Sequence, residues 1–185
     1  MPDKMIEDVD ATMDKAIEAV ERDLMALRTG RASTSLVEGV KVAAYGTESP
    51  LNHLATINTP DATSIVIQPF DPNQIAAVEK AILAANIGMT PNSDGKAIRL
   101  RVPALTEETR KEMVKKAHAI AEHGRVSVRN QRRQFNDEIK KKEKAHETSE
   151  DEAKRLLDEI QKHTDRHIKR IDELMAAKEK EIMQV

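Results

Sequence analysis

The chain opens with apolar residues that recur every three or four positions, the spacing of one face of an α-helix. Acidic residues crowd the first turns, where negative charge favours the helix dipole. Gly30 follows as a stop signal, and Arg28 lies in the last turn. This pattern predicts one amphipathic helix over residues 3–28, whose apolar face is formed by Ile6, Val9, Met13, Ala16, Val20, Leu24 and Leu27.

Between 31 and 103 the pattern changes to short β-branched runs separated by turn-forming residues. One stretch, 74–86, keeps the helical period and is predicted to be a helix. The rest is predicted to form a small sheet. The expected strands are 40–42, 64–67 and 98–102, and the expected turns are 45–47, 59–61, 70–73 and 91–95.

The helical period returns after Thr106, which is placed to cap a long helix with acidic residues in its first turn. A break is expected near 146–148. Ser149 and Glu152 then form a capping-box signature at the start of a last helix. Two long helices joined by a short loop pack antiparallel.

These boundaries predict an α+β protein in which an elongated three-helix bundle (1–29 and 105–185) carries an inserted small β/α/β domain (30–104). Two linkers attach the inserted domain, so we expect it to swing as a rigid body without tumbling freely; a fixed interface is the alternative. Gly30 supplies backbone freedom and Pro103 restricts it. The expected hinge residues are Gly30, Ala32, Ser33, Pro103, Ala104, Leu105 and Thr106.

Composition narrows the possible functions. The chain has no cysteine, which excludes disulfides and thiolate metal sites, and its three aromatic residues are too few for a base-stacking platform. No run is long and apolar enough to span a bilayer, and a cytoplasmic location is expected. The net charge of −2 hides a local excess of positive charge, because 104–146 holds 12 basic and 7 acidic residues. This stretch indicates an anionic partner.

The sharpest local feature is a row of arginines within 125–133. On a helix that turns about 100° per residue, these side chains share a sector roughly 100° wide. Guanidinium groups hold phosphate oxygens in pairs, so duplex RNA backbone is the expected target. The alternative is pairing with acids of the neighbouring helices. Arg125 has Glu122 three residues back and Arg133 has Asp137 four residues on, whereas Arg129 and Arg132 have no acid three or four residues away. The row consists of Arg125, Arg129, Arg132 and Arg133.

Other candidates carry less weight. The lysines at 140–142 and 144 are more typical of a solvated helix face. His163 and His167 have the i,i+4 spacing of metal ligands, but no third ligand is evident, and a position at the bundle surface or seam is the preferred interpretation. No catalytic constellation appears, so we expect neither an enzyme nor a metal or other cofactor.

The chain resembles the ribosome recycling factor family over essentially its full length. The order and spacing of the matching stretches together are specific, although each alone is weak. These stretches are Arg28–Ser33, Tyr45–Thr47, Leu51–Ala55, Glu79–Ile82, Gly88–Asn92, Pro103–Glu108, Val128–Arg133, Ser149–Asp151 and Lys178–Met183.

The resemblance implies an L-shaped pair of domains with dimensions like those of transfer RNA. It implies a monomer that binds the post-termination 70S ribosome through large-subunit rRNA, and elongation factor G as the GTPase partner at the hinge and smaller domain. By position it assigns the essential rRNA contact to Arg132, beside Arg129 and Arg133, and it adds Arg28 and Arg31 as further rRNA contacts.

Two departures from the family pattern qualify the resemblance. Gln134 and Phe135 replace an acidic and a small residue after the paired arginines, and Ala44 stands where an aromatic residue often precedes the tyrosine. Loss of the acid is expected to free the arginines. The alternative function, from another class, is a helical adaptor that binds only protein, with little dependence on salt.

Overall fold

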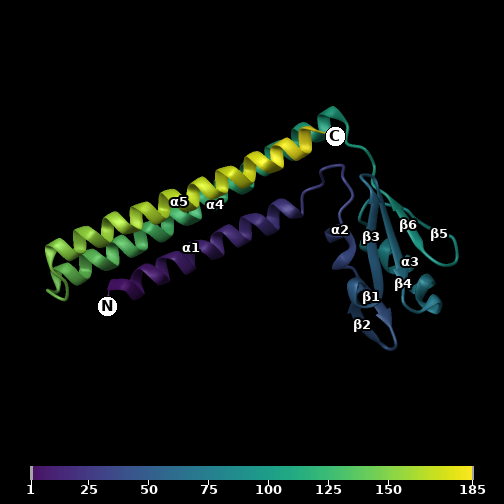
Figure 1. Cartoon of the computed structure of the whole chain (residues 1–185), viewed down its shortest axis with the longest axis horizontal. Coiled ribbons are helices and arrows are strands. Elements are labelled where there is room, and N and C mark those ends of the chain that lie inside the picture. The colour runs from purple at the N-terminus through teal and green to yellow at the C-terminus, as the bar shows by residue number, and fades with distance from the viewer. Residues whose placement is uncertain (1, 185) are drawn as a thin grey trace. The chain divides into compact units, whose positions relative to one another are not determined.

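The computed structural model describes residues 2–184 and divides the chain into two compact units (Figure 1). One unit comprises the residues up to Leu27 together with Lys111–Gln184, and the other comprises Arg28–Arg110. The α+β class with a helical part and a small sheet part is confirmed. The predicted domain limits, 1–29 with 105–185 and 30–104, stay a prediction, because spatial compactness does not show which limits allow independent folding.

The first unit is built from three long helices, α1 (Pro2–Met25), α4 (Glu107–Lys144) and α5 (Glu150–Met183) (Figure 1). Their apolar faces meet in a buried core, and burial of these side chains stabilises helices that would be marginal alone. Residues from all three helices are buried below one-tenth of their surface: Val9, Met13, Val20, Leu24, Met113, Ala117, Ala121, Val128, Ile139, Leu156, Ile160, Ile171 and Ile182.

The helix ends follow the local capping chemistry. The Ser149 hydroxyl accepts a hydrogen bond from the Glu152 amide at 3.2 Å, and the Thr106 hydroxyl accepts one from the Thr109 amide at 3.1 Å. The Glu152 carboxylate accepts from Arg155 on its own helix. Helix α1 ends at Met25, three residues before the predicted end. The amide of Leu27 donates to the carbonyl three residues back, that of Leu24, instead of the carbonyl four residues back that an α-helix requires.

The second unit contains two small antiparallel sheets. A hairpin pairs β1 (Lys41–Ala44) with β2 (Thr47–Pro50), and a four-stranded sheet has the order β3-β4-β6-β5. Its strands are β3 (Ala55–Asp61), β4 (Ser64–Pro69), β5 (Pro91–Ser93) and β6 (Ile98–Arg101). The helices are α2 (Ser35–Glu38) and α3 (Ile75–Ala85), with single 3-10 turns at Leu51–His53 and Pro72–Gln74.

The core of this unit is aliphatic and joins the hairpin, α3 and the four-stranded sheet. Alternate residues of β4 and β6 point into it, so their burial follows the two-residue period of a strand. The fully buried members are Val37, Val42, Leu51, Ile65, Ile67, Val78, Ile82, Ile98 and Leu100.

The predicted turn at 59–61 was wrong, and the predicted turn at 91–95 was wrong for its first three residues. Residues 59–61 end strand β3, and Pro91–Ser93 form strand β5. Both strands lie at the edges of the four-stranded sheet, where proline needs no partner for its missing N–H. The pairing of β3 with β4 also shifts register between Asn58 and Asp61, beside Pro60.

None of the helices among residues 2–184 is both long enough and apolar enough to cross a membrane.

Candidate nucleic-acid interface

The four predicted arginines form what we call the arginine ridge: Arg125, Arg129, Arg132 and Arg133 on α4. Cross-helix hydrogen bonds show that the ridge runs beside α5. Arg125 reaches Asp172 and Arg132 reaches Gln161. Because the later residue of α4 meets the earlier residue of α5, the two helices are antiparallel, as predicted from their short connection.

Arg125 is held inside the bundle surface. Its Nε lies 2.8 Å from Asp172 Oδ1 and its Nη1 lies 2.9 Å from Glu122 Oε2, while only 17% of its side chain is exposed. Burial lowers the pKa of this guanidinium, but the hydrogen bonds to Asp172 and Glu122 outweigh it and hold the pKa above its ordinary value. This geometry matches the alternative of internal pairing, so Arg125 is the ridge residue least available to an outside anion.

Arg129 and Arg132 are held more weakly. The Nη1 of Arg129 is 3.6 Å from Glu122 Oε1, beyond hydrogen-bond distance, and 41% of the side chain is exposed. Arg132 donates to the neutral amide oxygen of Gln161 at 3.3 Å. Within residues 2–184, no carboxylate lies within ion-pair distance of Arg132. Its charge is therefore left without a direct counter-ion.

Gln161 is a supporting residue that the sequence did not reveal. Its amide oxygen accepts from Arg132, and its amide nitrogen donates to Asp165 Oδ1 at 2.8 Å. The Gln161 side-chain amide thus orients the Arg132 guanidinium. It links this guanidinium only indirectly to the Asp165 carboxylate. The i,i+4 spacing of Gln161 and Asp165 was visible in the sequence, but the 29-residue separation from Arg132 was not.

The remaining basic residues of α4 differ in exposure. Arg133 is exposed, and the pair with Asp137 suggested by its spacing is not formed. Lys142 pairs with Glu138 at 2.9 Å, whereas Lys140 and Lys141 are exposed. On the part of α4 that follows Glu122, the outward positive charge is therefore carried mainly by Arg129, Arg132, Arg133, Lys140 and Lys141.

Arg28 and Arg31 lie in the sheet unit and behave differently from one another. Arg28 Nη2 donates to the Ile87 carbonyl at 2.8 Å, and its guanidinium covers Gly88 so closely that a Cβ there would meet Nη1 at 2.6 Å. Arg31 is exposed. Arg28 thus has a structural contact that competes with a role toward RNA, and Arg31 has a free surface position.

The predicted hinge residues lie in two irregular segments, 26–34 and 102–106. Gly30 has φ +75°, a conformation that side chains rarely adopt. The Ala32 amide donates to the Ala62 carbonyl and the Val102 amide to the Thr63 carbonyl, each at 2.7 Å. Both linkers are therefore bonded to the same turn of the sheet unit, at residues 62 and 63. In the first linker the bonded residue immediately precedes Ser33, and in the second it immediately precedes Pro103, Ala104, Leu105 and Thr106.

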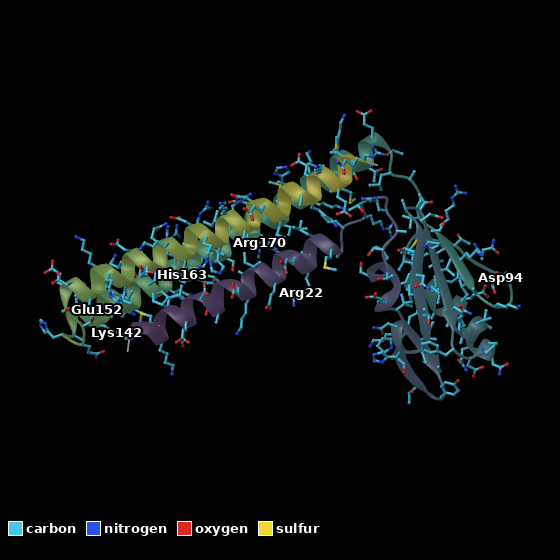
Figure 2. The ribbon with its side chains drawn as sticks, in the orientation of Figure 1. Arg22, Asp94, Lys142, Glu152, His163 and Arg170 are labelled. Carbon is cyan, nitrogen blue, oxygen red and sulfur yellow. The ribbon has the colours of Figure 1, made fainter. Side chains whose placement is uncertain are left out.

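The histidine pair lies at the seam between α1 and α5, and Figure 2 labels His163 on α5. His163 Nδ1 is 2.8 Å from Asp10 Oδ1, and His167 Nε2 is 2.9 Å from Asp14 Oδ1. The sequence reading missed these two carboxylates, which lie 153 residues away from their partners. Their own i,i+4 spacing on α1, matched to that of the histidines, was the available signal.

A row of arginines on one long helix, in which Arg129 and Arg132 have only weak partners, is typical of proteins that dock on nucleic-acid phosphates. The family model described as ribosome recycling factor matches residues 20–183. The chain therefore belongs to the ribosome recycling factor family.

Curated relatives support the same assignment along nearly the whole chain. The ribosome-recycling factor of Synechocystis sp. PCC 6803 is 56% identical over 173 residues, covering 94% of this chain and 95% of the relative. That of Symbiobacterium thermophilum is 48% identical over 185 residues, covering all of both chains.

Two solved structures resemble the fold. A solution structure of the ribosome recycling factor has a TM-score of 0.81 and 44% identity, covering 100% of this chain and 98% of that one. The second is a model of the T. thermophilus factor and E. coli elongation factor G bound to the E. coli post-termination complex. It has a TM-score of 0.68 and 42% identity, covering 99% of both chains.

Proposed function

We propose that this chain is a ribosome recycling factor in the cytoplasm. It binds the post-termination 70S ribosome and, with elongation factor G and GTP hydrolysis by that factor, separates the subunits and releases mRNA and tRNA. Family membership supports this proposal, and so does the description of a neighbour as bound with elongation factor G to a post-termination complex. The chain itself makes or breaks no covalent bond in this scheme and acts as a monomer.

The arginine ridge is the proposed contact with large-subunit rRNA. The observation that carries this step is Arg132, a guanidinium whose only bonded neighbour among the described residues is a neutral amide. A phosphate oxygen meeting this group gains a charge-assisted hydrogen bond without first breaking an ion pair. Arg129 and Arg133 extend the contact, and Arg31 adds a contact from the sheet unit. Arg28 adds another only when its guanidinium releases the Ile87 carbonyl.

Arg125 has a supporting place in this scheme. Its two carboxylate partners neutralise it, so its main effect is to fix α4 against α5 and keep the ridge straight. Phosphate contacts of this kind set position without reading sequence, because the phosphate backbone carries the same groups at every nucleotide. Docking therefore depends on a rigid row of charges, which a 38-residue helix provides.

The second step is a movement of the sheet unit about the two linkers, driven by elongation factor G. Gly30 and Pro103 are the proposed pivot positions, because each lies within an irregular linker and close to a residue, Ala32 or Val102, whose amide is bonded to the turn of the sheet unit. The chain has no cysteine, so a dye pair is introduced cleanly by Lys96→Cys and Glu173→Cys. Energy transfer should change when elongation factor G and GTP meet the ribosome-bound chain. An unchanged signal would contradict the pivot.

Docking is tested by co-sedimentation with 70S ribosomes through a sucrose gradient, comparing the wild type with Arg132→Ala. One lost charged hydrogen bond is worth about 1.5–3 kcal/mol, so binding should weaken roughly 10- to 150-fold. Arg22→Ala is the control, since Arg22 is exposed on α1 and its loss changes the net charge equally (Figure 2). Equal binding of Arg132→Ala and wild type would remove the role assigned to the ridge.

A further inference from the structure

A cluster of metal-ligating side chains lies where α1 packs against α5, separate from the arginine ridge. It consists of Asp10, Asp14 and His167, whose ligand atoms all lie within 4.8 Å of one another. We call it the seam cluster. His167 is 4% exposed, whereas the Asp14 side chain is 62% exposed and that of Asp10 is 36% exposed. The cluster thus has a buried nitrogen donor and two carboxylates that face solvent.

The hydrogen-bond pattern of His167 is incomplete for a neutral ring. Its Nδ1 lies 2.6 Å from the His163 carbonyl oxygen, and its Nε2 lies 2.9 Å from Asp14 Oδ1. Both neighbours are acceptors, while a neutral imidazole has only one N–H to donate. With Nδ1–H bonded to the carbonyl, the Nε2 lone pair faces a carboxylate oxygen. In this tautomer the Nε2 lone pair is available to a metal ion that the Asp14 carboxylate can bind as well.

We propose that the seam cluster binds a divalent transition-metal ion of the zinc class, with His167 Nε2, Asp14 and Asp10 as ligands. An imidazole whose Nδ1–H is held by a backbone carbonyl is the usual arrangement of a metal-binding histidine. The Nε2 atom lies 2.9 Å from Asp14 Oδ1 and 3.6 Å from Asp10 Oδ1. These separations bracket the edge of about 3.3 Å between ligands of a tetrahedral zinc ion.

The neighbours of the cluster orient it and limit its affinity. His163 Nδ1 lies 2.8 Å from Asp10 Oδ1 and fixes that carboxylate. Arg166 also bonds Asp10 Oδ1, and 62% of its side chain is exposed. The guanidinium occupies part of the carboxylate and repels a cation, but its exposure lets it swing into solvent. Arg166 is therefore a residue that tunes the affinity, and its removal should strengthen binding.

A bound ion joins the first and last helices of the bundle. Asp10 and Asp14 come from α1, and His167 comes from α5, more than 150 residues later. Because the ligand set exists only when α1 is docked, metal binding stabilises the docked helix by mass action. The solvent-facing side leaves a fourth position open to water, as in zinc sites with three protein ligands.

The experiment titrates the full chain with Zn²⁺ by calorimetry and follows helix melting by circular dichroism. We expect one ion per chain and a melting temperature that rises with free Zn²⁺. Asp14→Asn keeps the size of an exposed side chain and should weaken binding at least about 10-fold, since even loss of a residue behind a ligand costs 10–100-fold. Arg166→Gln should bind more tightly than the wild type.

The matched control is His123→Gln, an exposed histidine on α4 outside the cluster, which should bind Zn²⁺ as the wild type does. Co²⁺ supplies a second readout, because its visible absorption should appear in the wild type and disappear in Asp14→Asn. Absence of saturable binding, or equal binding by Asp14→Asn and the wild type, would overturn the proposal. Both readouts use the chain without ribosomes, so they test the metal site independently of the proposed ribosome binding.

Discussion

Replacing Gly124 by alanine places a methyl group where all three helices of the bundle meet. A Cβ built at this buried residue of α4 comes closer than 3.0 Å to Val20 Cγ2 of α1 and lies 3.3 Å from Ile171 Cδ1 of α5. Valine is stiff about χ1 in a helix and Val20 is 3% exposed, so it has no space to rotate into. Either α1 moves outward or side chains leave their preferred rotamers.

The expected change in the free energy of unfolding is the difference between two opposing effects of the new methyl group. Overpacking of a core costs about 1–3 kcal/mol, while alanine favours a helix over glycine by about 1 kcal/mol. Gly124→Ala should therefore lower the free energy of unfolding of the bundle by up to about 2 kcal/mol. Gly39→Ala is the control, because its Cβ meets nothing within 4 Å and its φ is −86°. That change should be neutral or stabilise by about 0.4–1 kcal/mol.

The assay is urea unfolding followed by helical circular dichroism for Gly124→Ala, Val20→Ala and the double variant. Removing the Val20 methyl groups opens space for the new Cβ, so the double variant should be more stable than the sum of the single effects by about 1 kcal/mol or more. Additive effects, or a Gly124→Ala variant more stable than the wild type, would refute the packing of α1 against α4 at this position.

Two local contacts give further predictions. Ser149→Ala should destabilise α5 by about 1 kcal/mol in urea unfolding, whereas Ser149→Asp, which keeps the acceptor, should not. Tyr45 donates to Asp71 Oδ2 at 2.7 Å and holds the pKa of that carboxyl below its ordinary value, so Tyr45→Phe should raise that pKa in an NMR titration. A lowered carboxyl pKa stabilises the fold above the unfolded-state pKa. That contribution is lost as pH falls through the folded-state pKa of Asp71. The Tyr45→Phe variant should therefore lose less stability than the wild type over this pH range.

The features that followed from sequence are those set by nearby residues. The two caps at Thr106 and Ser149 depend on groups three residues away, and the long helices depend on a regular apolar period. The strands β3 and β5 were missed because they are edge strands, where Pro60 and Pro91 are tolerated although proline usually indicates a turn. Local pattern alone does not show which strand will be at an edge.

The site shows the same division. The shared face of the four arginines and the Glu122 partner of Arg125 followed from helical spacing. The Asp172 partner, 47 residues away, and the carboxylates opposite the histidines depend on how helices pack. Those contacts decide which residues of the arginine ridge are available to an outside anion. Arg125 is neutralised by its partners, whereas Arg132 has no direct counter-ion among the described residues.

The most direct test of the account is the salt dependence of 70S ribosome binding by the wild type, Arg132→Ala and Arg22→Ala. If Arg132 neutralises an rRNA phosphate, the slope of log affinity against log salt should fall in magnitude by about 0.7–0.9 in Arg132→Ala and stay unchanged in Arg22→Ala. Parallel lines for all three proteins would contradict the claim that this guanidinium meets nucleic-acid phosphate.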